Sequence, residues 1–124
     1  MTSDGPSDII VAQRIRNRQL EWLEMVDGDD DDPWVFGFGS LVNLWFDWNP
    51  DEPEPAAYPP PTYAPGEAEA LVAVGRAMND FCDATPWPIV DAATARATPE
   101  WARTMTATRR ALAEMAARGR LPED

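Results

Sequence analysis

A proline-rich stretch between residues 50 and 65 constrains the fold of this chain more than any other feature. It reads PDEPEPAAYPPPTYAP and contains seven prolines, with no apolar periodicity. Proline lacks a backbone N–H group and fixes φ, so such a stretch cannot continue a helix or a central strand. Proline-rich segments are stiff and extended. We therefore predict a long irregular connection that wraps a helical body and is held to it by Tyr58 and Tyr63.

Apolar residues recur at steps of three and four on the N-terminal side of this connection, which is the pattern of an amphipathic helix. We predict residues 1–5 to be frayed and a first helix to run from Gly5-Pro6 to about Val26. A second, short helix is expected from about Leu41 to Trp48. The apolar face of the first helix is formed by Val11, Ala12, Ile15, Trp22, Leu23 and Val26.

The chain after the connection is also predicted to be helical. A third helix is expected from about Pro65 to Ala84, followed by a short turn or helix within 90–97. The last helix starts at Thr98-Pro99-Glu100, where a capping threonine, a proline and a first-turn acid follow one another. The residues expected to be buried by these two long helices are Leu71, Val74, Met78, Phe81, Cys82, Trp101, Met105, Leu112 and Met115.

Together these patterns predict a mainly α protein. We expect residues 1–124 to form a single compact helical domain with about three long helices, one or two short helices and the long proline-rich connection. Residues 27–65 form an acidic, aromatic and proline-rich segment between the first and third long helices. We find no internal repeat in the sequence.

Almost all of the net charge lies in one segment. Between Gln19 and Glu54 there are 11 acidic residues and no arginine or lysine, whereas the rest of the chain has 11 acids and 10 arginines. The chain as a whole carries a net charge of −12. A concentrated acidic field attracts a basic partner and raises its association rate by roughly 10–10³ fold at low salt. The segment is therefore our candidate interaction surface.

Residues 27–54, within this segment, hold half of the aromatic residues of the chain. We expect Trp45 and Phe46 to belong mainly to the core, because a short chain needs buried rings to stabilise it. Trp34 and Trp48 lie close to acids, a frequent composition of interface hot spots. The candidate partner-binding residues are Asp29, Asp30, Asp31, Asp32, Trp34, Asp47, Trp48, Asp51, Glu52 and Glu54.

The residue types that are missing exclude several chemistries. The chain has no histidine and one cysteine, which excludes Ser-His-Asp and Cys-His catalysis and a zinc cluster. Without lysine it has no Schiff-base nucleophile and no Walker-type phosphate loop. Cys82 falls on an apolar helical face and is expected to be a buried, inert thiol. We predict no enzyme, no cofactor and no metal, with a carboxylate pair such as Asp47 and Asp51 as the remaining catalytic alternative.

The acidic run from Asp29 to Asp32 does not have the spacing of a calcium loop. Such a loop needs a glycine at its sixth position and a glutamate at its twelfth, and the twelfth residue here is Ser40. We expect a solvated or partner-facing loop. The charge of the chain disfavours binding to nucleic acid or to an anionic membrane. With no apolar run of about 20 residues and no signal-peptide pattern, we predict a soluble, cytoplasmic protein.

Two short resemblances accompany these patterns. WVFGFGSL, at residues 34–41, resembles the glycine-containing substrate loop V-F-G-Y-G-S-L of gamma-glutamyl cyclotransferases. That family builds a mixed β-barrel with a catalytic glutamate on a later strand. Here residues 34–38 alternate as a short strand would, but everything after Pro65 is predicted to be helical, so the later strand and its glutamate are missing. The strings QRIRNR, WFDW and RGR are similar to small uncharacterised acidic bacterial proteins of immunity type. This second resemblance implies a bacterial binding protein and assigns no activity.

The function that these features favour is that of an acidic, protein-binding inhibitor. We expect an immunity protein that neutralises a basic-surfaced toxin or nuclease-like partner. The alternatives are an assembly subunit of a larger bacterial or phage complex and a phage anti-defence mimic of nucleic acid. Arg14, Arg16 and Arg18 are expected to be solvated or to pair with the acidic segment, with a basic binding patch as the alternative.

Overall fold

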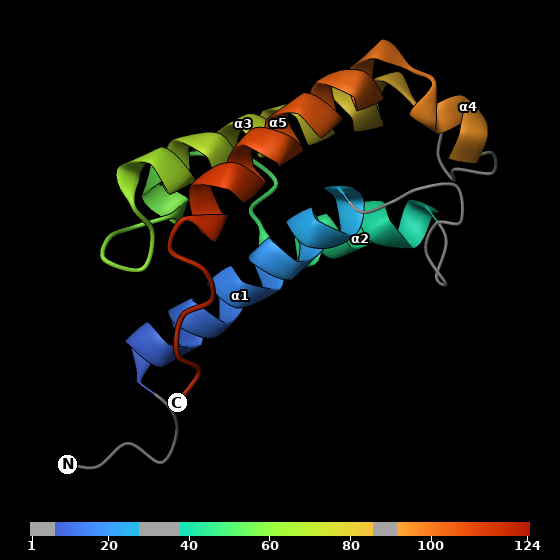
Figure 1. The fold of residues 1–124 in the computed structure, drawn as a ribbon. Coiled ribbons are helices and arrows are strands. Elements are labelled where there is room, and N and C mark those ends of the chain that lie inside the picture. Colours follow the sequence, from blue (N-terminus) through green and yellow to red (C-terminus); the bar gives the residue numbers. More distant parts are fainter. Residues whose placement is uncertain (1–6, 28–37, 86–91) are drawn as a thin grey trace.

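A computed structural model describes residues 7–27, 38–85 and 92–124, and all regular structure in these residues is helical (Figure 1). The predicted mainly α fold is confirmed. None of the described helices is both long enough and apolar enough to cross a membrane. The elements are α1 (Asp8–Asp27), α2 (Phe38–Trp48), the 3₁₀ turn η1 (Pro55–Ala57), α3 (Pro65–Ala84), α4 (Ala92–Arg96) and α5 (Pro99–Ala116).

Helices α3 and α5 form the central pair and lie side by side along most of their lengths (Figure 1). Helix α1 packs against α5, and α2 packs against α1. Aromatic rings join these layers, with Trp22 of α1 against Trp45 of α2 at a centroid distance of 4.8 Å. Phe81 of α3 contacts Trp101 of α5 in the same way, at 5.1 Å. The core therefore lies between the four longer helices.

The two ends of α5 agree with the predicted helix signals. The Thr98 side chain accepts a hydrogen bond from the backbone N–H of Trp101 at 3.1 Å, which caps α5. At the other end, the N–H of Gly119 donates to the carbonyl of Met115 at 2.9 Å. Gly119 has a φ of 72°, a conformation that glycine adopts without the strain that a Cβ atom would add.

The predicted apolar face of α1 is correct only in the C-terminal half of the helix. Trp22, Leu23 and Val26 are buried there, but Val11 is 41% exposed and Ile15 is only partly buried. The residues buried in the middle of α1 are instead Arg16, Asn17, Gln19 and Leu20.

Polar groups are buried in α1 because they have hydrogen-bond partners there. Asn17 donates to the carbonyl of Leu121 at 2.8 Å and accepts from the N–H of the same residue at 2.9 Å. The C-terminal tail thus lies along α1 and is bound through its backbone. Buried polar groups are tolerated when they are paired in this way.

The prediction for the arginine cluster of α1 is wrong for Arg16, which is neither solvated nor paired with the acidic segment. Its side chain is 0% exposed and forms an ion pair with Glu67 of α3. Arg14 donates to the backbone carbonyl of Glu123, and Arg18 pairs with the Glu123 carboxylate. The three arginines therefore connect α1 to α3 and to the C-terminal tail.

The remaining differences are small. Helix α2 begins at Phe38 rather than at about Leu41, so Phe38 is helical and does not end a strand. The rest of the predicted strand lies outside the described residues, as do residues 1–5. Cys82 is only partly buried, and burial raises the pKa of its thiol. Met105 and Leu112 pack against the core but keep part of their surface in solvent, since they lie at its edge.

Candidate functional site

The proline-rich connection is held to the helical body by its two tyrosines, as predicted. Tyr58 and Tyr63 are 2% and 5% exposed. The hydroxyl of Tyr58 donates to Oδ1 of Asn49 at 2.8 Å, and the hydroxyl of Tyr63 donates to Oε1 of Gln19 at 2.5 Å. The two rings also contact each other edge to face, at 5.2 Å. The connection is therefore fixed against α1 and the end of α2.

The backbone between α2 and η1 is fixed by three amide side chains. Gln19 donates to the carbonyl of Trp48, and Asn49 donates to the carbonyl of Trp45, both at 2.9 Å. From the other side, Asn79 of α3 donates to the carbonyl of Asp51, also at 2.9 Å. These contacts hold the backbone while leaving the acidic side chains of this stretch exposed.

A close approach between the connection and α3 adds to this rigidity. Pro53 lies directly over Gly75, where a Cβ atom would come within 2.8 Å of the proline Cβ. Glycine at position 75 is therefore what allows the connection to lie against α3 here.

Five of the predicted partner-binding residues lie in this fixed stretch and are exposed. We call them the acidic-aromatic surface; they are Asp47, Trp48, Asp51, Glu52 and Glu54. Trp48 is 36% exposed, and it is one of four exposed large apolar side chains in the described structure. Asp29 to Asp32 and Trp34 lie outside the described residues.

The carboxylates of the acidic-aromatic surface have no arginine partner within the described part of the chain. Elsewhere in the described residues, eight ion pairs join acids to arginines of α1, α5 and the C-terminal tail. The acids are Glu21, Glu24, Asp27, Glu67, Glu69 and Glu123. The four carboxylates of the surface are therefore available to an external cation.

The position of these acids also opposes helix stability. Asp47 lies in the last turn of α2, and Asp51 and Glu52 follow shortly after its end. A helix C-terminus carries a partial negative charge, so an acid there is unfavourable by about 0.3–1 kcal/mol. No basic residue occupies that last turn. The stability of the helix therefore does not explain the acids at this position.

The burial of Trp45 and Phe46 agrees with the prediction from the sequence. Trp45 is fully buried, and Phe46 is partly buried against the core. Sequence reasoning did not find the amide side chains that hold the surface, Gln19, Asn49 and Asn79. Isolated amides carry no pattern in the sequence that distinguishes a structural hydrogen bond from a solvated side chain.

The chemistry of the surface is that of solvated carboxylates beside an indole ring. Among the described residues, no group of three or more acids and thiols is arranged to hold a metal ion. Such a surface offers negative charge and apolar ring contact. No family model, no curated protein and no solved structure matches this chain.

Proposed function

We propose that this chain is a protein-binding inhibitor of immunity type, which neutralises a toxin or nuclease-like protein by covering its basic surface. The proposal is supported above all by four exposed carboxylates that lie near Trp48 in the sequence and have no arginine partner among the described residues. No enzymatic step is required for this function. The partner is identified by its chemistry, as a protein with a concentrated positive charge.

Inhibition of this kind follows from charge and shape. A nuclease binds its substrate through a cleft lined by arginine and lysine, which donate hydrogen bonds to the phosphates. Carboxylates held in the same cleft pair with those arginine and lysine side chains and exclude the substrate. The acidic field steers the encounter, and Trp48 contributes apolar contact at the centre.

The rigidity of the acidic-aromatic surface supports tight binding. Ordering a flexible loop on association costs about 0.5–1.5 kcal/mol for each side chain immobilised. Here the hydrogen bonds of Gln19, Asn49 and Asn79 order the backbone before any partner arrives. The backbone of the acidic-aromatic surface is therefore already ordered, and binding does not have to order it.

The test is a pull-down from the native host, with wild-type protein and two matched variants as bait. The first variant, D47N/D51N/E52Q/E54Q, neutralises the surface. The second, D8N/D83N/E114Q/D124N, neutralises four exposed acids elsewhere. Both variants change the net charge by the same amount, from −12 to −8, since each removes four carboxylates.

We expect a stoichiometric basic protein to bind the wild type and the control variant, and to be released by washing at high salt. The surface variant should fail to capture it. Equal capture by both variants would remove the surface from the mechanism. A partner retained at high salt would instead indicate a permanent subunit of a larger assembly, because salt screens exposed charge pairs.

A further inference from the structure

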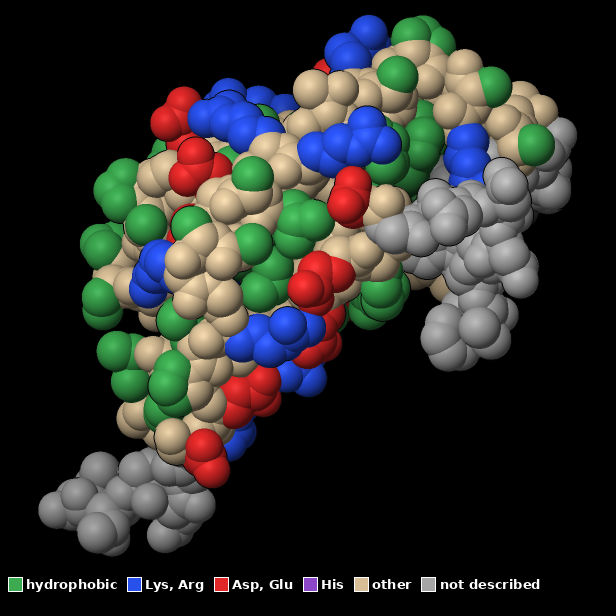
Figure 2. All heavy atoms as spheres, viewed as in Figure 1, with side chains coloured by type: hydrophobic (Ala, Val, Ile, Leu, Met, Phe, Trp, Pro, Cys, Tyr) green, Lys and Arg blue, Asp and Glu red, His purple; other side chains and the backbone are tan. Residues whose placement is uncertain are grey.

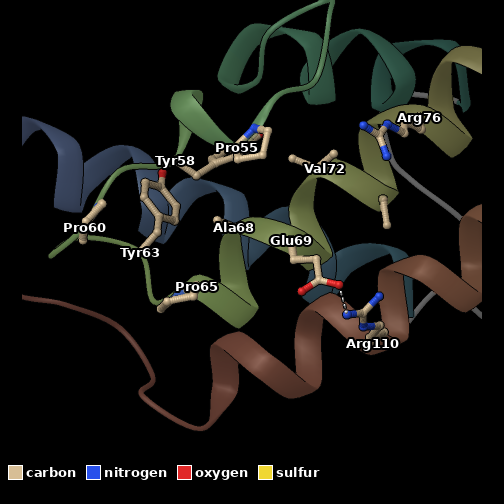
Figure 3. A pocket seen from close by; sticks show the side chains of 11 residues that line it. Pro55, Tyr58, Pro60, Tyr63, Pro65, Ala68, Glu69, Val72, Arg76 and Arg110 are labelled. Atoms are coloured by element: carbon tan, nitrogen blue, oxygen red, sulfur yellow. Dashed lines mark ion pairs between the residues drawn. The ribbon is translucent and has the colours of Figure 1, made fainter.

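A second surface, of opposite charge, lies along the seam between α3 and α5. Two adjoining cavities, of about 600 Å³ and about 390 Å³, share Ala73 and Arg110 in their walls. The larger also contacts the proline-rich connection (Figure 3). We call the two together the seam groove. Their size is that of a site for a sizeable ligand or for a segment of another protein.

The charged residues of the seam groove are mostly arginines. Arg76 of α3 and Arg103 and Arg110 of α5 line it, and the one acid in its lining, Glu69, pairs with Arg110 at 3.4 Å. Within the described residues, Arg76 and Arg103 form no ion pair. The groove thus carries a local excess of positive charge in a chain whose net charge is −12. Figure 2 shows arginine side chains gathered over the α3 and α5 side of the molecule.

The floor of the seam groove is apolar. In the smaller cavity it is made of small side chains, Ala73 of α3 and Ala102 and Ala107 of α5. The larger cavity is lined by Val72 and by prolines and tyrosines of the connection. Small side chains on a pair of neighbouring helices leave a furrow into which the ridge of a third helix fits. The arginines then lie at the sides of such a helix rather than beneath it.

The spacing of the arginines also suits a helix. Arg103 and Arg110 are seven residues apart on α5, which places them about 10.5 Å apart along its axis. Two acids with the same seven-residue spacing on a helix lying alongside α5 face both guanidinium groups. Arginine binds carboxylates through a planar fork of N–H donors, which makes this contact directional.

We propose that the seam groove binds an amphipathic helix with acidic flanks, contributed by a partner protein. The apolar stripe of that helix lies on the alanine floor, and its acids face Arg76, Arg103 and Arg110. Glu54 lies next to Pro55, at the end of the groove formed by the connection, where it repels acids of a ligand. The acids of the ligand therefore lie at the other end of the groove, near Arg103. This proposal stands apart from the inhibitor function, because it uses a different surface and a ligand of opposite charge.

The test measures the binding of three fluorescently labelled synthetic peptides of about 18 residues, enough for five helical turns. The first has leucines on one helical face and glutamates on its flanks. The second carries lysine in place of every glutamate. The third keeps the glutamates but has a central proline, which breaks the helix. Anisotropy is recorded against increasing concentrations of the full-length protein at low and moderate salt.

We expect the first peptide to bind wild-type protein in a salt-dependent manner, and the proline peptide to bind at least tenfold more weakly. R103Q and R110Q should each weaken binding of the first peptide by a factor of about 2–5, the loss expected when one exposed ion pair is removed. The matched control is R109Q. Arg109 is the neighbour of Arg110, is exposed, and pairs with Asp27 outside the groove, so this variant should bind as the wild type does.

Three outcomes would overturn the proposal. One is absence of binding by the glutamate peptide, and another is equal binding by the proline peptide, which would exclude a helical ligand. The third is an equal effect of R109Q and R103Q, which would show that net charge rather than the groove governs binding. Binding of the lysine peptide that is lost in D47N/D51N/E52Q/E54Q would report on the acidic-aromatic surface alone, so the two proposals fail separately.

Discussion

Arg16 on α1 and Glu67 on α3 form an ion pair that is closed to solvent. Their side chains are 0% and 1% exposed, and Nη2 of Arg16 lies 2.7 Å from Oε2 of Glu67. Glu67 also accepts hydrogen bonds from Arg118 at 2.9 Å and from the backbone N–H of Ala64 at 3.0 Å. Arg16 donates in addition to the carbonyl of Gly119 at 2.6 Å. This one pair therefore joins α1, the start of α3 and the end of α5.

Replacing Glu67 with alanine should destabilise the fold by about 3–5 kcal/mol, because it leaves Arg16 charged and buried without its partner. The matched control is Glu69→Ala on the same helix. Its ion pair with Arg110 is exposed, so that change should cost about 1 kcal/mol or less. Urea denaturation followed by circular dichroism measures both free energies of unfolding.

The double variant R16M/E67L separates charge from packing. Replacing a buried ion pair by apolar side chains of similar volume is often neutral or stabilising, so the double variant should recover most of the stability that E67A loses. A double variant as unstable as E67A would mean that the hydrogen bonds to Gly119 and Ala64 matter more than the pairing of the two charges.

The sequence predicts the helices well because their signals are local. The periodic apolar residues and the Thr98-Pro99-Glu100 start lie within a few residues of the elements that they define. The Arg16–Glu67 pair has no such signal, since its members are 51 positions apart. A buried arginine looks like a solvated one in the sequence, and for this reason the face of α1 was predicted with the wrong residues in its N-terminal half.

The candidate surface also has features with a local sequence signal and features without one. Asp47, Trp48 and Asp51 are close in the sequence, so their proximity in space could be predicted from composition. The fixed backbone beneath them depends on Gln19 and Asn79, which come from two other helices. The seam groove could not be predicted either, because it arises only where α3 and α5 pack together.

Alkaline pH should destabilise the protein through its two tyrosines. Burial raises the pKa of Tyr63 from 10.0 to about 12, and burial also raises the pKa of Tyr58. The stability that the buried, neutral tyrosines contribute is therefore fully present below pH 10, where both tyrosines are neutral in the folded and in the unfolded state. It is lost as the pH rises from 10 to about 12, by roughly 2–3 kcal/mol for Tyr63.

The chain contains only these two tyrosines, so tyrosinate absorbance reports on them alone. In folded protein the absorbance should rise well above pH 10, whereas in urea it should rise near the ordinary value. Y63F should remove part of the alkaline loss of stability. A normal titration curve in folded protein would place both hydroxyls in contact with solvent and contradict their burial.

Two glycines of α3 should respond in opposite directions to alanine. At Gly75 the added Cβ meets the ring of Pro53 at 2.8 Å, and neither that ring nor the helix backbone can move freely. We expect Gly75→Ala to destabilise by about 1–3 kcal/mol, as overpacking does. At Gly66 the nearest atom is the Glu114 carboxylate, also at 2.8 Å, at the end of a flexible side chain.

Gly66→Ala should therefore be neutral or stabilising by up to about 1 kcal/mol, since alanine favours the helix more than glycine. Thermal unfolding of both variants measures the difference. If Gly75→Ala also raised the melting temperature, the connection would be free to move away from α3, and the acidic-aromatic surface would not be rigid.

Two tryptophans of α2 should separate stability from binding. Trp45 is 0% exposed and contacts Trp22, so Trp45→Ala should destabilise by about 3–5 kcal/mol. Trp48 is 36% exposed, and Trp48→Ala should cost less, about 2–3 kcal/mol, because the rest of the ring is buried. If Trp48 is the apolar anchor of the interface, its removal should weaken partner binding by about 2 kcal/mol or more. Calorimetric titration of the purified partner into folded Trp48→Ala measures that loss. Unchanged affinity would leave the carboxylates as the whole of the interface, and the dependence of affinity on salt would then be steeper than for a surface that also binds through a ring.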